Sequence, residues 1–386
     1  MVKRNYFIII LYFFIFQSFF NSLIASDNKD YLDIEDSHNV EVTVSVEKEL
    51  FPVIAKFLSE GKENSESSVQ PTPALYYDEV SKQIIIPQRQ NARLNLPPLV
   101  KWNIQNKNDF PKKVTIVTEI PEWTQPVIST VILGENETKE IHQTPFGIRL
   151  LGNISTMPST ILLKVKAEDE IIFEETRNIR IRPADDMIWS LHTPLDTKSL
   201  IAAWVTPKNG MVERILSNAK EKLYTRSLSG YQNPDVISQV KAIFNAVRNA
   251  KVSYVSSIMS FGTIGFTQRV RLPQESILQK SANCIDGAVL LASLFENIGL
   301  EPLIVLVPEH AFVGVRLSPN SNETIFIETV LIGRPILQSI LTLETAFESA
   351  VKEGTNRYNI EMQKNPAQVQ IIDIKKEREN GIYPLW

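Results

Sequence analysis

The stretch NCIDGAVLLASLFENIGLEPLIVLVPEHAFVGV, residues 283–315, decides the fold of the C-terminal half of the chain. Its first half is apolar on nearly every side, which is typical of a helix buried inside a domain. Asn283 is a good N-cap for this helix, and Gly299 is a good C-terminal stop. Two runs rich in β-branched residues follow at 302–307 and 311–317, and they predict neighbouring strands. A buried helix followed by an antiparallel sheet indicates an α+β domain.

Cys284 is the only cysteine of the chain and lies in the first turn of the predicted helix. This end of a helix carries the positive end of the dipole, which favours a thiolate over a thiol. A nucleophilic cysteine benefits from the position, whereas a structural one has no use for it. Two alternatives stay open: a small buried hydrophobe, as most free cysteines are, and a thiol that pairs with another molecule.

His310 opens the second predicted strand, and Glu328 lies in a third strand predicted over 325–330. If these strands form a hairpin with its turn centred on residue 319, His310 lies opposite Glu328. A register shifted by two residues keeps both side chains on one face, whereas a shift of one separates them. A carboxylate beside a histidine orients the ring and supports its protonated form, and the imidazolium then stabilises a neighbouring thiolate. Cys284, His310 and Glu328 are therefore the candidate catalytic residues.

The helix that begins with CID at 284–286, with His310 and Glu328 on the strands after it, resembles the transglutaminase-like superfamily. The resemblance covers roughly residues 191–386 and is clear over 268–333. It implies a papain-like α+β core with a Cys-His-Asp triad, here Cys-His-Glu, in a bacterial exported member.

Three features depart from the pattern of this superfamily. Ala282 stands where a glycine is common, and Glu328 replaces the commoner aspartate, which adds a methylene. No side chain is identified for the oxyanion hole, which leaves the backbone N–H of Cys284 as a donor. These departures leave room for an inactive descendant.

The leading functional hypothesis is an exported thiol enzyme that acts on amide or peptide bonds of a protein or peptide substrate. Cys284 would form a thioester, His310 would shuttle the proton, and Glu328 would hold the ring. Water as acceptor makes the protein a peptidase or amidase, and an amine makes it a cross-linking acyltransferase; the sequence does not choose. The second hypothesis is a catalytically inactive transglutaminase-like protein that serves as a binding or structural module at the cell envelope.

The composition and motifs of the chain exclude some classes of binding partner and cofactor. A net charge of −4 over 386 residues provides no basic field, so nucleic acid is not expected as a partner. No cofactor is expected, and no metal-binding spacing or phosphate-binding loop is found. The remaining histidines, His38, His142 and His192, are assigned no role. The oligomeric state stays open.

The N-terminal segment, residues 1–26, has the form of a secretory signal peptide. Lys3 and Arg4 precede an apolar run at 7–16, and small residues follow. The alternative is an uncleaved N-terminal anchor, because the apolar stretch is barely long enough to span a bilayer. We therefore expect a periplasmic or extracellular protein that meets the membrane only through this segment if the segment is retained.

The rest of the chain divides into three parts. Residues 27–73 are predicted to be an acidic leader and flexible linker, with a short helix at 46–59. Residues 74–188 predict an antiparallel, immunoglobulin-like β-sandwich, and residues 189–386 the transglutaminase-like α+β domain. The strands predicted for the sandwich are at 83–88, 113–120, 127–133, 161–167, 170–175 and 179–183. The α+β domain is predicted to have helices at 212–224, 236–249, 281–298 and 342–354 and a last strand at 369–374.

Overall fold

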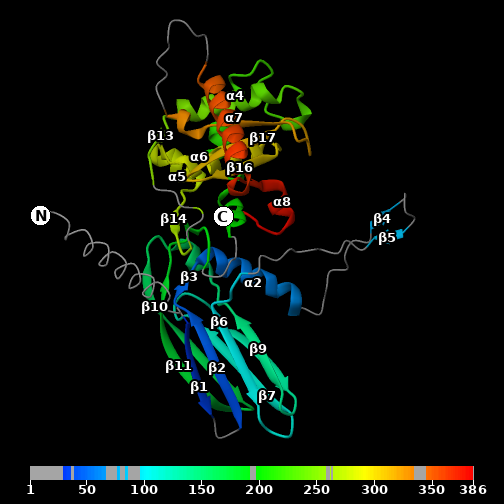
Figure 1. Ribbon diagram of the computed structural model, residues 1–386, viewed down its shortest axis with the longest axis vertical. Helices are drawn as coiled ribbons and strands as arrows, with labels where there is room; N and C mark the ends of the chain where they lie inside the picture. The colour runs from blue at the N-terminus through cyan, green and yellow to red at the C-terminus, as the bar shows by residue number, and fades with distance from the viewer. Residues whose placement is uncertain are drawn as a thin grey trace, which may run out of the picture. The chain divides into compact units, whose positions relative to one another are not determined.

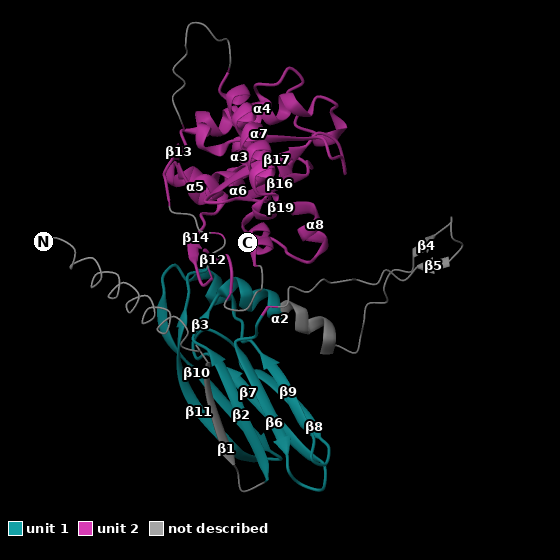
Figure 2. Ribbon diagram, in the orientation of Figure 1, with its two compact units in different colours: residues 1–66, 97–184 teal, residues 67–96, 185–386 magenta. Residues whose placement is uncertain are grey.

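Two compact units divide the chain, residues 1–66 with 97–184 and residues 67–96 with 185–386 (Figure 2). The computed structural model describes residues 29–35, 39–66, 76–78, 83–85, 96–191, 197–257, 261, 264–333 and 345–385.

Some predictions concern residues outside these ranges. The predicted signal or anchor at 1–26 is among them, as are His38 and His192. Within the described part of the chain, no helix is both long enough and apolar enough to cross a membrane.

The first unit is built from two sheets that share one core (Figure 1). In spatial order, the four-stranded sheet consists of β1 (Lys29–Glu35), β2 (Val40–Glu47), β6 (Val100–Asn106) and β9 (Thr138–Gln143). The five-stranded sheet consists of β3 (Glu49–Leu50), β11 (Glu170–Ile181), β10 (Met157–Ala167), β7 (Lys112–Glu119) and β8 (Val127–Leu133). All pairs are antiparallel except that of β3 with β11.

The leader and linker predicted over 27–73 were wrong where the structure describes these residues, because 29–35 and 39–50 supply strands of this unit and 52–66 a helix; residues 67–73 lie outside the described ranges. Along β2 the valines at 40, 42, 44 and 46 are buried, with Glu41 and Thr43 partly exposed between them. This alternation has the period of a strand and pairs β2 with β6, whereas the neighbouring acidic residues had suggested a leader. The helix predicted from residue 46 begins only at Pro52, where α2 (Pro52–Glu66) starts with a proline in its first turn.

The other strand predictions for this unit differ mainly in their ends. Residues 113–120, 127–133 and 161–167 lie in or overlap β7, β8 and β10. The runs at 170–175 and 179–183 belong to one strand, β11. The run at 83–88 contributes β5 (Gln83–Ile85), which pairs with β4 (Tyr76–Asp78) and not with either large sheet.

The second unit has a four-stranded antiparallel sheet with the spatial order β18 (Thr324–Ile327), β17 (His310–Arg316), β16 (Pro302–Val307) and β19 (Gln370–Asp373). Its helices are α3 (Gly210–Lys220), α4 (Val236–Asn249), α5 (Pro273–Gln279), α6 (Cys284–Asn297), α7 (Ala346–Lys364) and α8 (Ile374–Glu379). Two further pairs join β12 (Asp186–Ile188) to β14 (Thr267–Arg269) and β13 (Ser253–Tyr254) to β15 (Ser281–Ala282). Every residue of α6 from Cys284 to Phe295 is buried, so this helix forms the centre of the unit.

Gly354 allows α7 to pack closely against the end of β18. A Cβ at this position would lie 2.6 Å from the carbonyl oxygen of Phe326. Alanine usually stabilises a helix interior by up to about 1 kcal/mol relative to glycine, but forced overpacking costs about 1–3 kcal/mol. We therefore expect Gly354→Ala to lower the free energy of unfolding by about 1 kcal/mol in urea denaturation. Gly210→Ala is the control, because nothing lies within 4 Å of its added Cβ; equal stability of both variants would contradict the prediction.

Candidate active site

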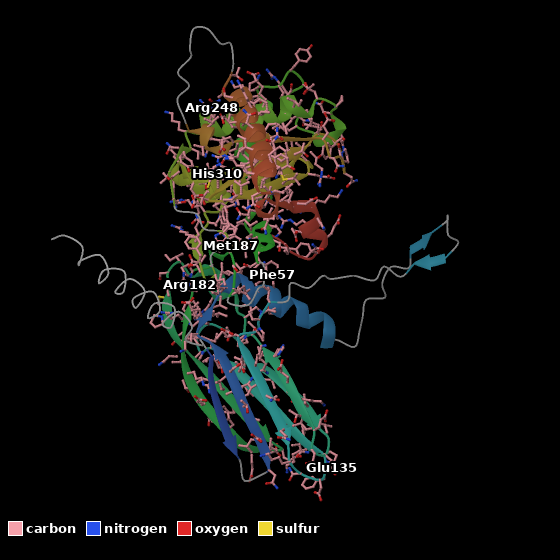
Figure 3. All side chains as sticks on the ribbon, viewed as in Figure 1. Phe57, Glu135, Arg182, Met187, Arg248 and His310 are labelled. Atoms are coloured by element: carbon pink, nitrogen blue, oxygen red, sulfur yellow. The ribbon has the colours of Figure 1, made fainter. Side chains whose placement is uncertain are left out.

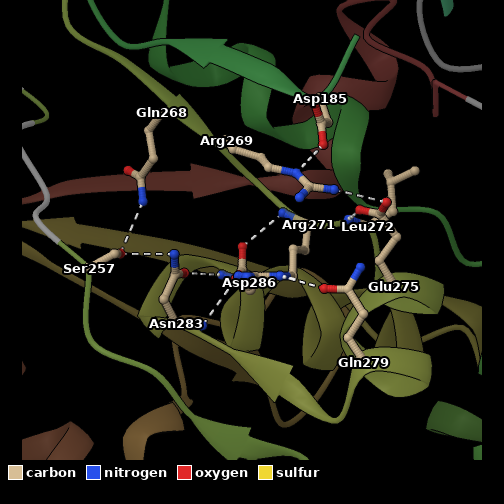
Figure 4. Close-up of polar contacts among 10 residues, drawn as sticks. All are labelled: Asp185, Ser257, Gln268, Arg269, Arg271, Leu272, Glu275, Gln279, Asn283 and Asp286. Carbon is tan, nitrogen blue, oxygen red and sulfur yellow. Dashed lines mark hydrogen bonds and ion pairs between the residues drawn. The ribbon is translucent and has the colours of Figure 1, made fainter. Parts of the chain in front are cut away.

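The N-terminus of α6 presents Cys284 as the first helical residue. Asn283 is the N-cap: its Oδ1 accepts from Asp286 N at 2.9 Å, and Asp286 Oδ2 accepts from Asn283 N at 3.0 Å (Figure 4). This reciprocal capping box fixes the turn that carries the cysteine. As the first residue of the helix, Cys284 has a backbone N–H with no partner inside the helix, and this N–H is free to face a substrate.

The hairpin of β17 and β18 has a register different from the predicted one. Val313 pairs with Ile327 and Arg316 with Thr324, so the turn is centred on residue 320 rather than 319. The predicted pairing of His310 directly opposite Glu328 was therefore wrong by two residues. A shift of two residues still leaves both side chains on the same face of the hairpin. The third strand also ends earlier than predicted, at Ile327.

Glu328 leaves the sheet but is held at three points. Its backbone N–H donates to Ala350 O on α7 at 2.9 Å, and its Oε1 accepts from Val330 N at 3.0 Å. Its Oε2 lies 2.8 Å from Nε2 of His310. The carboxylate is thereby aimed at the histidine ring by backbone contacts on both sides.

His310 lies between Glu328 and Cys284, and Figure 3 labels it within the second unit. Glu328 occupies Nε2 of the ring, and the side chain of Cys284 also interacts with His310. Burial alone would lower the pKa of His310, but the hydrogen bonds and charges of Cys284 and Glu328 outweigh it and raise the pKa to about 9. The histidine is therefore protonated at neutral pH, which supports a thiolate beside it.

Thr329 ties the acid to the nucleophile through a contact that is not predicted from the sequence. It follows Glu328 in the short 3-10 helix η4 (Thr329–Ile332), and its Oγ1 donates to the carbonyl of Cys284 at 3.1 Å. Gly287 makes room for it, because a Cβ there would lie 3.0 Å from the Cβ of Thr329. A small residue three positions after Cys284 was the only signal of this contact in the sequence.

The site is deeply buried. Cys284 is 2 % exposed as a residue, and the side chains of His310 and Glu328 are 13 % and 10 % exposed. Among the described residues, no three His, Cys, Asp or Glu side chains are grouped so as to hold a metal ion. His142 lies on β9 in the first unit, where its ring contacts Glu140.

Comparisons with known proteins add little to this geometry. No family model matches the chain, and no curated protein matches it in sequence. Among solved structures, the chain is similar to a Cytophaga hutchinsonii protein provisionally described as a cysteine protease, with 12% sequence identity and a TM-score of 0.21. The match covers 58% of this chain and 73% of the other. This is a weak structural likeness to a protein of the cysteine hydrolase kind.

Proposed function

We propose that this protein is an exported thiol enzyme of the transglutaminase-like kind, acting on amide or peptide bonds of a protein or peptide substrate. The observation that carries the proposal is the position of His310, which is hydrogen-bonded to Glu328 and interacts with the side chain of Cys284. Nucleophile, base and orienting acid are the three parts that covalent acyl transfer requires. Export is supported by the charged and apolar pattern of residues 1–26.

The residues have defined roles in this reaction. The thiolate of Cys284 attacks the carbonyl carbon of the amide, and the Cys284 backbone N–H donates to the oxygen that becomes negative. His310 gives its proton to the departing amine, which leaves a thioester on the sulfur. Water or a second amine then attacks the thioester while His310 takes a proton back, and the thiolate is released. Glu328 holds the ring in place throughout.

The alternative is a non-catalytic binding or structural module at the cell envelope. The observation that favours it is the 2 % exposure of Cys284, since a substrate carbonyl must reach the sulfur. The two hypotheses differ in one measurable property, the reactivity of the thiol.

The test is the pH dependence of Cys284 alkylation by iodoacetamide, in wild type and in His310→Ala. We expect rapid labelling below pH 7 in wild type. We expect labelling at pH 6 to fall at least about tenfold in the variant, because the thiolate loses its cationic neighbour.

Arg357→Met serves as the control for a substitution that removes a cation from an exposed helix face of the same unit. Slow wild-type labelling that rises only near pH 8.5, or labelling that ignores His310, would reject the enzyme and favour the binding module.

A further inference from the structure

A buried ion pair lies two residues along α6 from the nucleophile. The side chain of Asp286 is 0 % exposed, and its Oδ2 accepts from Arg271 Nη1 at 2.8 Å (Figure 4). Its Oδ1 accepts from the backbone N–H of Arg271, also at 2.8 Å. Together with the capping bond from the backbone N–H of Asn283, three donors converge on the carboxylate of Asp286.

Asp286 places a buried negative charge in the helical turn that carries Cys284. The two side chains do not face each other, because two residues correspond to about 200° around the helix as well as a rise of about 3 Å. In a buried first turn, an uncompensated carboxylate would nevertheless oppose formation of the thiolate. Burial raises the pKa of Asp286, although the hydrogen bonds from Asn283 and Arg271 oppose this effect. The guanidinium of Arg271 acts beside these backbone contacts, and as the positive charge hydrogen-bonded to the carboxylate it offsets the field of Asp286.

The pair is anchored from the far side as well. Arg271 Nε donates to Gln279 Oε1 at 3.1 Å, which ties the guanidinium to the end of α5. Arg269 contributes a second positive charge to Asp286, but its own hydrogen bonds go to Asp185 and Glu275. The charged groups shown to interact with Asp286 are Arg269 and Arg271 before α5, and His310 on β17 interacts with Cys284 and with Glu328 before η4.

We propose that Arg271 and Asp286 are positioning residues for Cys284: their pair fixes the first turn of α6 and balances the charge beside the thiolate. The inference rests on the proposed function, because it assumes an activated thiol. Because the charges of Arg271 and Asp286 cancel, the imidazolium of His310 is the cation that favours the thiolate of Cys284.

The variant Arg271→Met separates charge from position. It keeps the backbone contacts of Asp286 with Arg271 and Asn283, and so the capping box, but removes the compensating cation. We expect the midpoint of the iodoacetamide labelling profile to rise by about one pH unit, which slows labelling at pH 6 about tenfold. Arg271→Lys, which restores the charge, is expected to recover most of the rate. Asp286→Asn leaves the guanidinium unpaired, so its midpoint is expected to move in the opposite direction.

Arg316→Met is the matched control. The Arg316 side chain is 20 % exposed against 24 % for Arg271, and it also pairs with a carboxylate, that of Asp373. We expect this variant to lower the stability of the unit without moving the labelling profile. A folded Arg271→Met protein whose profile overlays that of wild type would overturn the inference, as would shifts in the same direction for Arg271→Met and Asp286→Asn. Failure of the proposed function is distinguished by a separate comparison: slow labelling of wild type at low pH, or equal labelling of wild type and His310→Ala.

Discussion

In Glu328→Gln, His310 is expected to titrate about two pH units lower than in wild type, where its pKa is about 9. Glutamine keeps the length of the side chain but removes the charge. The lowering of the His310 pKa by burial is then opposed only by Cys284. The titration is measured by the chemical shifts of the His310 ring protons in NMR spectra recorded across about pH 5 to 11, which extends about two units either side of the expected midpoints.

The same change alters the pH dependence of stability. Because its folded-state pKa of about 9 lies above the ordinary 6.5, protonated His310 stabilises the wild-type fold fully below pH 6.5, and this contribution is lost as the pH rises through 9. In Glu328→Gln we expect the stabilisation by protonated His310 to be lost at a lower pH than in wild type, about two units below 9. Glu328→Asp, which keeps the charge but shortens the reach by one methylene, is the control and should titrate between the two. A wild-type-like titration in Glu328→Gln would contradict the assignment of Glu328 as the orienting acid.

Arg378→Met is expected to lower the free energy of unfolding of the second unit by about 3–5 kcal/mol. The Arg378 side chain is 16 % exposed and forms two hydrogen bonds to the carboxylate of Glu296, at 2.9 and 3.0 Å. It also donates to the carbonyls of Ala202, Val205 and Ile382. Methionine fills part of the space but leaves a half-buried carboxylate and three carbonyls without this donor, and such groups are costly to leave unsatisfied.

Urea denaturation followed by tryptophan fluorescence measures this effect, because Trp189 and Trp204 are buried in the same unit. Arg357→Met is again the comparison: Arg357 is 47 % exposed and contacts Glu361 at 3.7 Å, so a loss below about 0.5 kcal/mol is expected. Similar losses in both variants would show that the contacts of Arg378 contribute no more than a surface ion pair.

Elements with strong local signals could be predicted from the sequence. The helix predicted at 236–249 has those bounds in the structure, because Asp235 caps it and its apolar stripe has helical spacing. In the site, the order of cysteine, histidine and acid was enough to propose a contact, and the structure places His310 Nε2 at 2.8 Å from Glu328. The immunoglobulin-like and transglutaminase-like assignments of the two units stay predictions.

What the sequence did not reveal depends on partners far away in the chain. The polar run around Arg177 suggested a break between two strands, but Arg177 bonds Glu175 at 2.9 Å and reaches the carbonyl of Val44, so β11 continues through it. The register of the β17–β18 hairpin depends on the length of its turn, and a shift of two residues leaves the same alternation in the sequence. The contact of Thr329 with Cys284 has no signal near Thr329 and only the small Gly287 near Cys284, because it joins two segments only after both have folded.

The strands contributed by residues 40–50 have a consequence for how the first unit forms. Leu50 pairs with Ile181 and Val44 with Trp102, so the N-terminal strands cannot find their neighbours until much of the chain is available. Such non-local pairing makes folding slow. In the meantime β6 has a free edge along Val100–Asn106, with backbone N–H and C=O groups that another chain could pair with. A protein shortened to begin at residue 74 would keep that edge permanently, and self-association would then compete with folding.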